Sequence, residues 1–236
     1  MRKQILDKNT WLRLRVQLRS NYGFSDNWGK LIELFKQRIE NYYLIPLNKI
    51  KDPNALKGEG FTILTIQCAL IEMFAAFKYG KIHNYRKRGA QPLYEYKMAD
   101  HCFINFLQTE TIFENHFFKF INGQKILNDP FSAKEFYNSV RCGLMHEART
   151  KGNWIINAKK TYIGDERIFI TEVNGTIRVD RTILNKLLTE YLESYLLGLT
   201  SQNQDGDNLR RLFARKLDHF YDILPDPTLY DWWEDR

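Results

Sequence analysis

The chain has 236 residues, of which 44% are apolar and 14% aromatic, with a formal net charge of +7 and an isoelectric point near 9.2. This length and apolar content are enough for a buried core, and they exclude a disordered or collagen-like chain. The positive charge favours a polyanionic partner at long range, although a basic balance alone is weak evidence for nucleic-acid binding.

The cysteines and the N-terminal segment indicate the compartment. The three cysteines are Cys68, Cys102 and Cys142. They are widely separated and show no Cys-x-x-Cys spacing, which argues against a disulfide framework or a zinc site and fits a reducing compartment. The first fifteen residues, MRKQILDKNTWLRLR, lack the apolar stretch of a signal peptide. We therefore expect a cytoplasmic protein with no metal and no cofactor.

Hydrophobic periodicity predicts helices in the first half of the chain. Asp26 can cap a helix that runs to about Leu44. Residues 61–81 form the most hydrophobic segment, which Gln and Glu interrupt, and this suits a buried core helix better than a membrane span. Two shorter helices are predicted near residues 93–107 and 112–121.

A basic segment separates the hydrophobic helix from the two shorter ones. Residues 83–92, HNYRKRGAQP, combine positive charge with Gly and Pro and are predicted to form an exposed connection. Arg86, Lys87 and Arg88 in this segment are candidates for gripping an RNA backbone. Solvated surface charge is the other interpretation.

The next predicted helix has the clearest start. Ser132 and Glu135 form a Ser-x-x-Glu capping box, which opens a helix that runs to about Arg149. On a helical wheel one side collects Ala133, Phe136, Tyr137, Val140 and Leu144, which we expect to face the core. The opposite side collects Asn138, Arg141, Cys142, Met145, His146 and Arg149.

Strand-forming residues follow this helix. Residues 153–180 are rich in β-branched and aromatic residues, with Asn174-Gly175 as a tight-turn signal, and predict a small antiparallel β-hairpin insert. Asp180 then caps a helix to about Leu199, and a further helix is predicted from about residue 209 to 224. The fold class is mainly α, with one domain over residues 1–236 in which the helices of 181–236 complete the bundle.

The outward face of the 132–149 helix predicts a second packed surface. A solvated face would be rich in Lys and Glu, whereas this one mixes arginine, histidine and asparagine with semi-apolar residues. Gly143 costs about 1 kcal/mol relative to Ala in a helix, which suggests a close backbone approach there. Self-association of two such helices would use both features. A two-fold axis would also bring two pairs of Arg141 and His146 into one cleft.

Arg141 and His146 are a suitable pair for phosphodiester chemistry. Histidine titrates near neutrality and can take the proton of a ribose 2′-OH or protonate the leaving 5′ oxygen. Arginine stabilises the negative charge that builds on the phosphoryl oxygens. Such a reaction needs no metal, requires RNA, and leaves a 2′,3′-cyclic phosphate.

The stretch FYNSVRCGLMHEARTKGNW resembles the HEPN superfamily, whose signature is an arginine, four to six residues and a histidine on a helix of an all-α domain. The resemblance implies a HEPN-like helical bundle, a homodimer formed through the 132–149 helix, and Arg141 and His146 as the catalytic pair of a metal-independent ribonuclease. It also implies a toxin or antiphage defence effector with an antitoxin or defence-system partner. Cys142 stands where active members often carry Asn, His or Asp. Ala148 stands where toxins silenced by adenylylation carry tyrosine, so that control is not expected.

Several supporting residues have two interpretations each. Glu72 either holds Arg141 in place or is satisfied locally, for example by Lys78. Arg149 either binds phosphate or stabilises the helix dipole, and Asn138 presents a weaker version of the same choice.

The C-terminal region has similar alternatives. A second basic set, Arg210, Arg211, Arg215 and Lys216, is either an RNA-binding surface or solvated charge. The aromatic segment 230–233 is either a tail docked on the body or a base-stacking platform.

The sequence thus predicts an endoribonuclease that acts on RNA, with tRNA among the candidate substrates. The alternative is a non-catalytic HEPN module that binds RNA or a protein and uses the same face for dimerisation. A DNA-binding regulator is a third interpretation, for which no helix-turn-helix signature is found.

Overall fold

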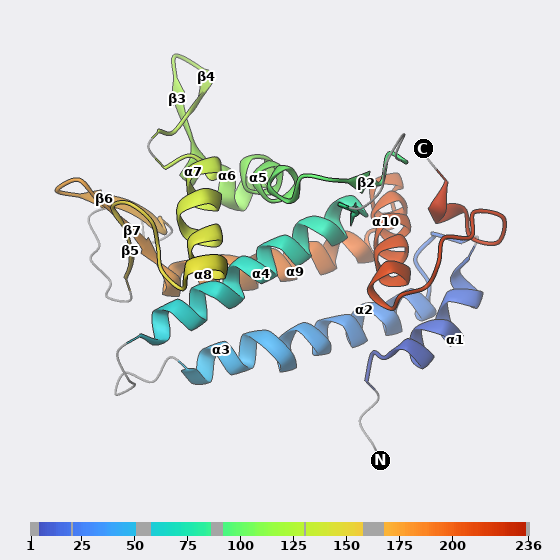
Figure 1. The fold of residues 1–236 in the computed structure, drawn as a ribbon. Helices are drawn as coiled ribbons and strands as arrows, with labels where there is room; N and C mark the ends of the chain where they lie inside the picture. The colour runs from blue at the N-terminus through green and yellow to red at the C-terminus, as the bar shows by residue number, and fades with distance from the viewer. Residues whose placement is uncertain are drawn as a thin grey trace. The chain divides into compact units, whose positions relative to one another are not determined.

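The computed structural model describes residues 5–19, 21–50, 58–85, 92–129, 131–157 and 168–234. These residues are mostly helical, with three small sheets, which confirms the prediction of a mainly α protein (Figure 1). Arg86, Lys87 and Arg88 of the basic segment lie outside the described residues.

The chain forms two compact units. Unit 1 comprises Met1–Ile45, Met73–Ala99 and Leu192–Arg236, and unit 2 comprises Pro46–Glu72 and Asp100–Tyr191. Helices α4 (Glu59–Tyr79) and α9 (Arg181–Thr200) each contribute residues to both units. The single domain predicted from the sequence stays a prediction.

Unit 1 is built from helices around an aromatic core. Its elements are α1 (Lys8–Leu18), α2 (Asp26–Ile39), the π-helical η1 (Glu40–Leu44), the second part of α4, β1 (Ile82–His83), β2 (Glu95–Tyr96), the second part of α9, α10 (Gln204–Phe220) and the 3-10 turn η3 (Asp231–Trp233). The rings of Phe35, Phe77 and Phe213 have centroids 4.9 to 5.4 Å apart. Each fully buried ring of this kind contributes roughly 1.5–3 kcal/mol.

Helix boundaries in unit 1 differ in part from the prediction. Helix α2 begins at Asp26, but its N-cap residue is Ser25, so Asp26 is the first helical residue and not the cap. The helix also continues beyond Leu44. Helix α10 begins five residues earlier than expected because the Asn203 side chain caps it by accepting from the Gly206 amide at 2.9 Å.

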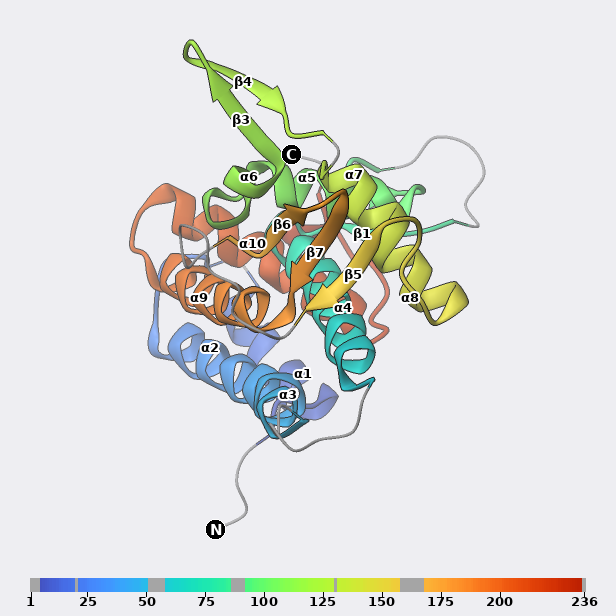
Figure 2. The ribbon, with the colours of Figure 1, turned by 90° about the vertical axis from the view of Figure 1, so that its left-hand side faces the viewer.

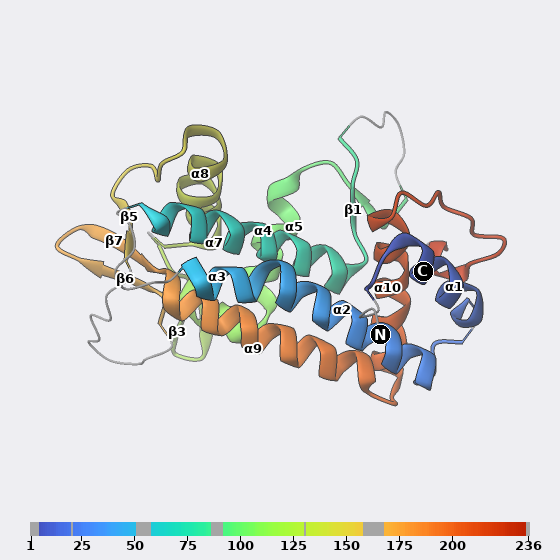
Figure 3. The ribbon, with the colours of Figure 1, turned by 90° about the horizontal axis from the view of Figure 1, so that it is seen from below.

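A buried carboxylate fixes the C-terminal segment of unit 1. Asp218 is fully buried and accepts hydrogen bonds from the indoles of Trp11, Trp232 and Trp233 at 2.8–2.9 Å and from Arg15 at 2.7 Å. Figure 3 shows α1, α10 and the C-terminal segment gathered together. The prediction of a docked tail is therefore confirmed, because Trp232 and Trp233 are buried rather than open for base stacking.

The predicted second basic surface is wrong for three of its four members. Arg210, Arg211 and Arg215 are buried. Arg211 and Arg215 donate to main-chain carbonyls of residues 231–234, and Arg210 donates to those of 22, 199 and 201. Because their donors are used inside the unit, these side chains are not a surface for RNA.

Unit 2 carries the remaining elements. They are α3 (Ile45–Ile50), the first part of α4, α5 (Ala99–Thr109), α6 (Thr111–Phe117), β3 (Phe118–Ile121), β4 (Gln124–Leu127), α7 (Ala133–Glu135), the π-helical η2 (Phe136–Arg141), α8 (Cys142–Glu147), β5 (Trp154–Asn157), β6 (Ile170–Val173), β7 (Thr176–Asp180) and the first part of α9. Phe117, Phe136 and Phe169 form an aromatic cluster with centroids 6.0–6.1 Å apart. Asp180 caps α9 as predicted, accepting from the amides of residues 182 and 183.

The strands after the motif helix form a mixed sheet in the order β5-β7-β6 (Figure 2). β6 and β7 are antiparallel and joined by Asn174-Gly175, both with positive φ, as a tight hairpin turn requires. β5 pairs with β7 in parallel, with Trp154 opposite Ile177. The prediction of a purely antiparallel insert is therefore wrong for β5.

A second hairpin was not predicted. The segment expected to end a short helix at residue 121 turns into β3, which pairs with β4 around Asn122-Gly123. The hairpin projects from α6 in Figures 1 and 2. Asn-Gly between apolar residues was the signal in the sequence.

Helix α4 is the hydrophobic helix that the sequence predicted over residues 61–81. Among the described residues it is the one helix long and apolar enough to cross a membrane, and 56% of its most apolar window is buried inside the molecule. Core helices of soluble proteins have the same length and composition, so this is weak evidence for a membrane span.

Candidate functional site

The helix predicted to carry the chemistry is continuous from Ala133 to Glu147 and changes its winding midway. The Ser132 hydroxyl accepts a hydrogen bond from the Glu135 amide at 3.2 Å, as the capping box predicts. The turns of η2 are π-helical and end at Arg141, and α8 then returns to α geometry. Such π-helical turns occur frequently at functional sites, where the wider turn shifts the side chains that follow. We call the segment 132–147 the motif helix.

Arg141 is held by a carboxylate from α4. Its Nε and Nη2 donate to Glu72 Oε1 at 3.1 and 2.9 Å, and the two side chains are 14% and 33% exposed. Of the two interpretations of Glu72, contact with Arg141 is therefore the one that the geometry supports. Glu72 engages only one edge of the guanidinium, so Nη1 is not used by this carboxylate.

The surroundings of Arg141 are partly apolar. Burial lowers the pKa of the guanidinium, but Glu72, Tyr137 and Cys142 together raise it, so the net shift of the Arg141 pKa is upward. The guanidinium lies over the Tyr137 ring at 5.3 Å from its centroid. Burial raises the pKa of Tyr137 to about 12, against the opposing effect of Arg141. Arg141 is thus a permanent cation held rigidly between a carboxylate and an aromatic ring.

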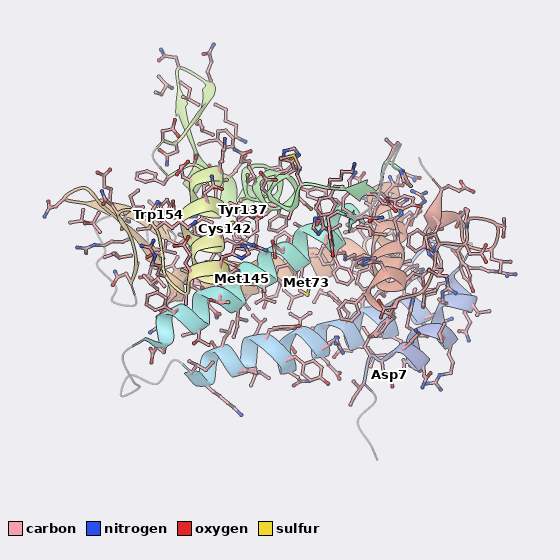
Figure 4. All side chains as sticks on the ribbon, viewed as in Figure 1. Asp7, Met73, Tyr137, Cys142, Met145 and Trp154 are labelled. Carbon is pink, nitrogen blue, oxygen red and sulfur yellow. The ribbon has the colours of Figure 1, made fainter. Side chains whose placement is uncertain are left out.

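His146 lies farther along the same helix and is exposed. Asn138, Met145 and Arg149 are exposed too, whereas Arg141 and Cys142 are half-buried. Figure 4 labels Tyr137, Cys142 and Met145 in succession along this helix. The outward-facing side that the helical wheel predicts is therefore accessible only in part in the single chain, because Arg141 packs against Glu72 of α4. His146 follows Arg141 by about 140° around the helix axis and about 7.5 Å along it.

The chain turns back sharply after the motif helix. Ala148 adopts a left-handed conformation with φ 53°, which ends the helix. The Arg149 amide donates to the Gly143 carbonyl at 3.3 Å and the Lys151 amide to the Ser139 carbonyl at 2.9 Å. A Cβ added to Gly143 would lie 2.4 Å from the Arg149 carbonyl oxygen. The close approach expected at Gly143 is present, but the approaching backbone belongs to the same chain and not to a second copy.

Three charged side chains gather where the motif helix ends. Arg149 Nε and Nη2 donate to Glu147 Oε2 at 3.0 and 2.9 Å, and Lys151 Nζ lies 2.8 Å from Glu147 Oε1. Hydrogen bonds from Lys151 and Arg149 lower the pKa of Glu147. Sequence reasoning considered Arg149 but missed Glu147 and Lys151, although their i,i+4 spacing was a signal for an ion pair.

Side chains of the metal-ligating types do not cluster in the described part of the chain. No group of three or more His, Cys, Asp or Glu side chains there is arranged to hold a metal ion. Cys68, Cys102 and Cys142 form no disulfide. The predicted set is thus divided: Glu72 and Arg141 are in contact, while Asn138, His146 and Arg149 share the exposed side of the motif helix and the turn that follows.

Comparisons of this chain with protein-family models, with curated proteins and with solved structures gave no match.

Proposed function

We propose that this protein is a metal-independent endoribonuclease similar to the HEPN superfamily, in which Arg141 and His146 carry the chemistry. The observation that carries the proposal is the guanidinium of Arg141, which Glu72 fixes and whose side chain is 14% exposed, on the same helix that exposes His146. An orienting carboxylate such as Glu72 is what a transition-state-stabilising arginine needs, because catalysis depends on donors held in place before the reaction.

In the proposed reaction the ribose 2′ oxygen attacks the adjacent phosphorus and the 5′ oxygen of the next nucleotide leaves. His146 takes the 2′-OH proton or delivers a proton to the 5′ oxygen. Arg141 donates through the edge that Glu72 does not engage to the non-bridging oxygens as their negative charge grows. The products are a 2′,3′-cyclic phosphate and a 5′-OH end.

A homodimer formed through the 132–149 helix is part of the proposal. A single chain supplies one His146, whereas an isologous interface presents the same surface twice. In the dimer one His146 can therefore act as base and the other as acid. The exposed Met145, which is 49% accessible and lies next to His146, gives this face the apolar content that an interface core needs.

We further propose a cytoplasmic toxin or antiphage effector that cuts RNA, with tRNA as the first substrate to test. An antitoxin or another defence-system protein is the expected regulatory partner. The alternative, a non-catalytic module that binds RNA or a protein, would use the same face for dimerisation alone.

The test is cleavage of total tRNA and of an end-labelled RNA by purified protein in excess EDTA. We expect the wild type to cleave and to leave cyclic phosphate ends. Arg141→Ala and His146→Ala are each expected to lower the rate by about 100-fold or more, the range of a general acid–base group or an oxyanion donor. Circular dichroism and size-exclusion chromatography would show that the variants remain folded and in the same oligomeric state.

Two matched controls exist in the chain. His101 and Arg13 are exposed residues on other helices, and His101→Ala and Arg13→Ala are expected to cleave like the wild type. Equal loss of activity in a control and in His146→Ala would point to a contaminating nuclease. A wild type that cuts only with added metal, or does not cut, would contradict the proposed mechanism.

A further inference from the structure

The cluster of Arg149, Lys151 and Glu147 is not used by the proposed reaction. Both cations point their donors at the same carboxylate, one to each oxygen. The side chains of Arg149, Lys151 and Glu147 are 65%, 40% and 37% exposed, respectively. The cluster has a net charge of +1 and is open to solvent directly after His146.

The backbone fixes the two cations beside the motif helix. The left-handed turn at Ala148 reverses the chain, and amide hydrogen bonds tie residues 149 and 151 to the carbonyls of Gly143 and Ser139. The absence of a side chain at Gly143 is what lets the Arg149 carbonyl approach. Arg149 and Lys151 are therefore anchored at the backbone, while their ends can exchange partners.

The contacts with Glu147 are weak enough to be exchanged. Exposed ion pairs contribute between 0 and about 1 kcal/mol, because water and salt screen them and ordering the side chains costs entropy. A phosphodiester likewise presents two charged oxygens, one for each cation, and a nucleic-acid strand adds the gain from released counterions. An RNA phosphate therefore competes well for these two cations.

We propose that Arg149 and Lys151 form a phosphate-binding subsite for the RNA strand next to the phosphodiester that is cut, and that Glu147 occupies this subsite when RNA is absent. Glu147 thus acts as an internal competitor that RNA displaces. The proposal rests on RNA being the substrate, and it concerns binding rather than the cleavage step.

The test is fluorescence anisotropy with a labelled single-stranded RNA in which every ribose is 2′-O-methylated, measured with the full chain at several salt concentrations in EDTA. This probe lacks the nucleophile and cannot be cut by 2′-OH attack, so the result does not depend on catalysis. The variants are Glu147→Gln and the double variant Arg149→Gln with Lys151→Gln.

We expect Glu147→Gln to bind the probe roughly three- to ten-fold more tightly, because it frees both cations. The double variant should bind about ten-fold or more weakly at low salt, and its log–log salt dependence should be shallower by roughly 1.4, about 0.7 for each lost phosphate contact with a single strand. The matched control is the exposed i,i+4 pair of Lys186 and Glu190 on α9. Lys186→Gln and Glu190→Gln are expected to change affinity less than two-fold.

Three other binding results would overturn the inference. Affinities of Glu147→Gln and the double variant that stay within two-fold of the wild type would show that the cluster does not face RNA. Tighter binding by Glu147→Gln without weaker binding by the double variant would show that Glu147 only repels RNA and that the two cations do not bind it. A wild type that does not bind the probe would overturn the subsite even if RNA were cut, whereas binding without cleavage would refute the nuclease and leave the subsite in place.

Discussion

Arginines occur in two regions of this chain with opposite surroundings. In unit 1, Arg210, Arg211 and Arg215 on α10 are buried and donate to main-chain carbonyls. In unit 2, Arg141 is half-buried against one carboxylate and Arg149 is largely exposed. The two sets look alike as basic residues in a sequence. The difference lies in how far each side chain is buried, because Arg141 and Arg149 use the same two guanidinium nitrogens as Arg215 does. A buried arginine holds the fold, whereas an exposed one such as Arg149 remains accessible to a ligand.

The largest expected effect comes from breaking the buried network of unit 1. Asp218→Asn removes the charge that Arg15 pairs with, and loss of one partner of a buried pair costs about 3–5 kcal/mol. We expect a large fall in the denaturant midpoint of unfolding at neutral pH. Asp205→Asn, at an exposed position in the first turn of the same helix, is the control and should cost less than about 1 kcal/mol.

On the exposed side of the motif helix, by contrast, we expect substitutions to have little effect on the free energy of unfolding. His146→Ala should change the free energy of unfolding by no more than about 0.5 kcal/mol. The comparison would fail if Asp218→Asn left stability unchanged or if His146→Ala were strongly destabilising. Either result would mean that the buried network of unit 1 and the exposed side of the motif helix do not differ in their contribution to the fold.

An intermediate effect is expected at Gly143. Alanine is favoured over glycine in a helix by about 1 kcal/mol, but here its Cβ would meet the Arg149 carbonyl oxygen at 2.4 Å. We expect Gly143→Ala to lower the free energy of unfolding by about 1–3 kcal/mol, since overpacking must move backbone. Thermal melting followed by circular dichroism would measure it.

Gly29 in α2 is the matched control for this substitution. A Cβ there would meet the Phe24 ring at an ordinary 3.6 Å, so Gly29→Ala should be neutral or stabilising. A stabilising Gly143→Ala would mean that the returning segment does not pack on the motif helix.

A small, pH-dependent effect concerns His219 on α10. Burial, followed by the charge of Lys216, lowers its pKa to about 4 from 6.5, although Asp222 and Glu95 act in the opposite direction. As the pH falls, His219 takes up a proton near pH 6.5 in the unfolded chain but only near pH 4 in the folded protein. The folded state is therefore most stable relative to the unfolded state above pH 6.5, and the stability that depends on the neutral ring is lost as the pH falls toward 4.

Since the ring is only half-buried, the effect on stability should be at most about 1 kcal/mol after screening by solvent. Wild type and His219→Asn should therefore differ in the pH dependence of the unfolding midpoint between pH 6.5 and 4. Titration of the ring by NMR would give its pKa directly, and an ordinary value would contradict the prediction.

Local signals in the sequence predicted the ends of several helices. Ser132 and Asp180 cap the helices that they were expected to cap, because a cap depends only on neighbours within three residues. Asn174-Gly175 likewise gives a tight turn. The wheel for the motif helix placed Asn138, Met145 and His146 on an exposed side correctly, but Arg141, which ends the more widely wound η2, lies against Glu72 of α4 with only 14% of its side chain exposed.

Features that depend on distant parts of the chain could not be predicted. The burial of Arg211 and Arg215 depends on carbonyls of residues 231–234, which no local pattern connects to α10. The sequence left two interpretations of Glu72, contact with Arg141 or a local partner. Arg141 is 69 positions away along the chain, and only the packing of α4 against the motif helix brings the two side chains together. The parallel pairing of β5 with β7 likewise joins residues more than twenty positions apart, such as Trp154 and Ile177, and no local pattern predicts it.

The distribution of tryptophan has a practical consequence for spectroscopy. Four of the five indoles, those of Trp11, Trp28, Trp232 and Trp233, belong to unit 1, and only Trp154 belongs to unit 2. Intrinsic fluorescence will therefore report mainly on the part of the chain that holds the Asp218 network. In a Trp154→Phe protein it would report on that part alone, and the difference from the parent signal would isolate the emission of the strand that follows the motif helix.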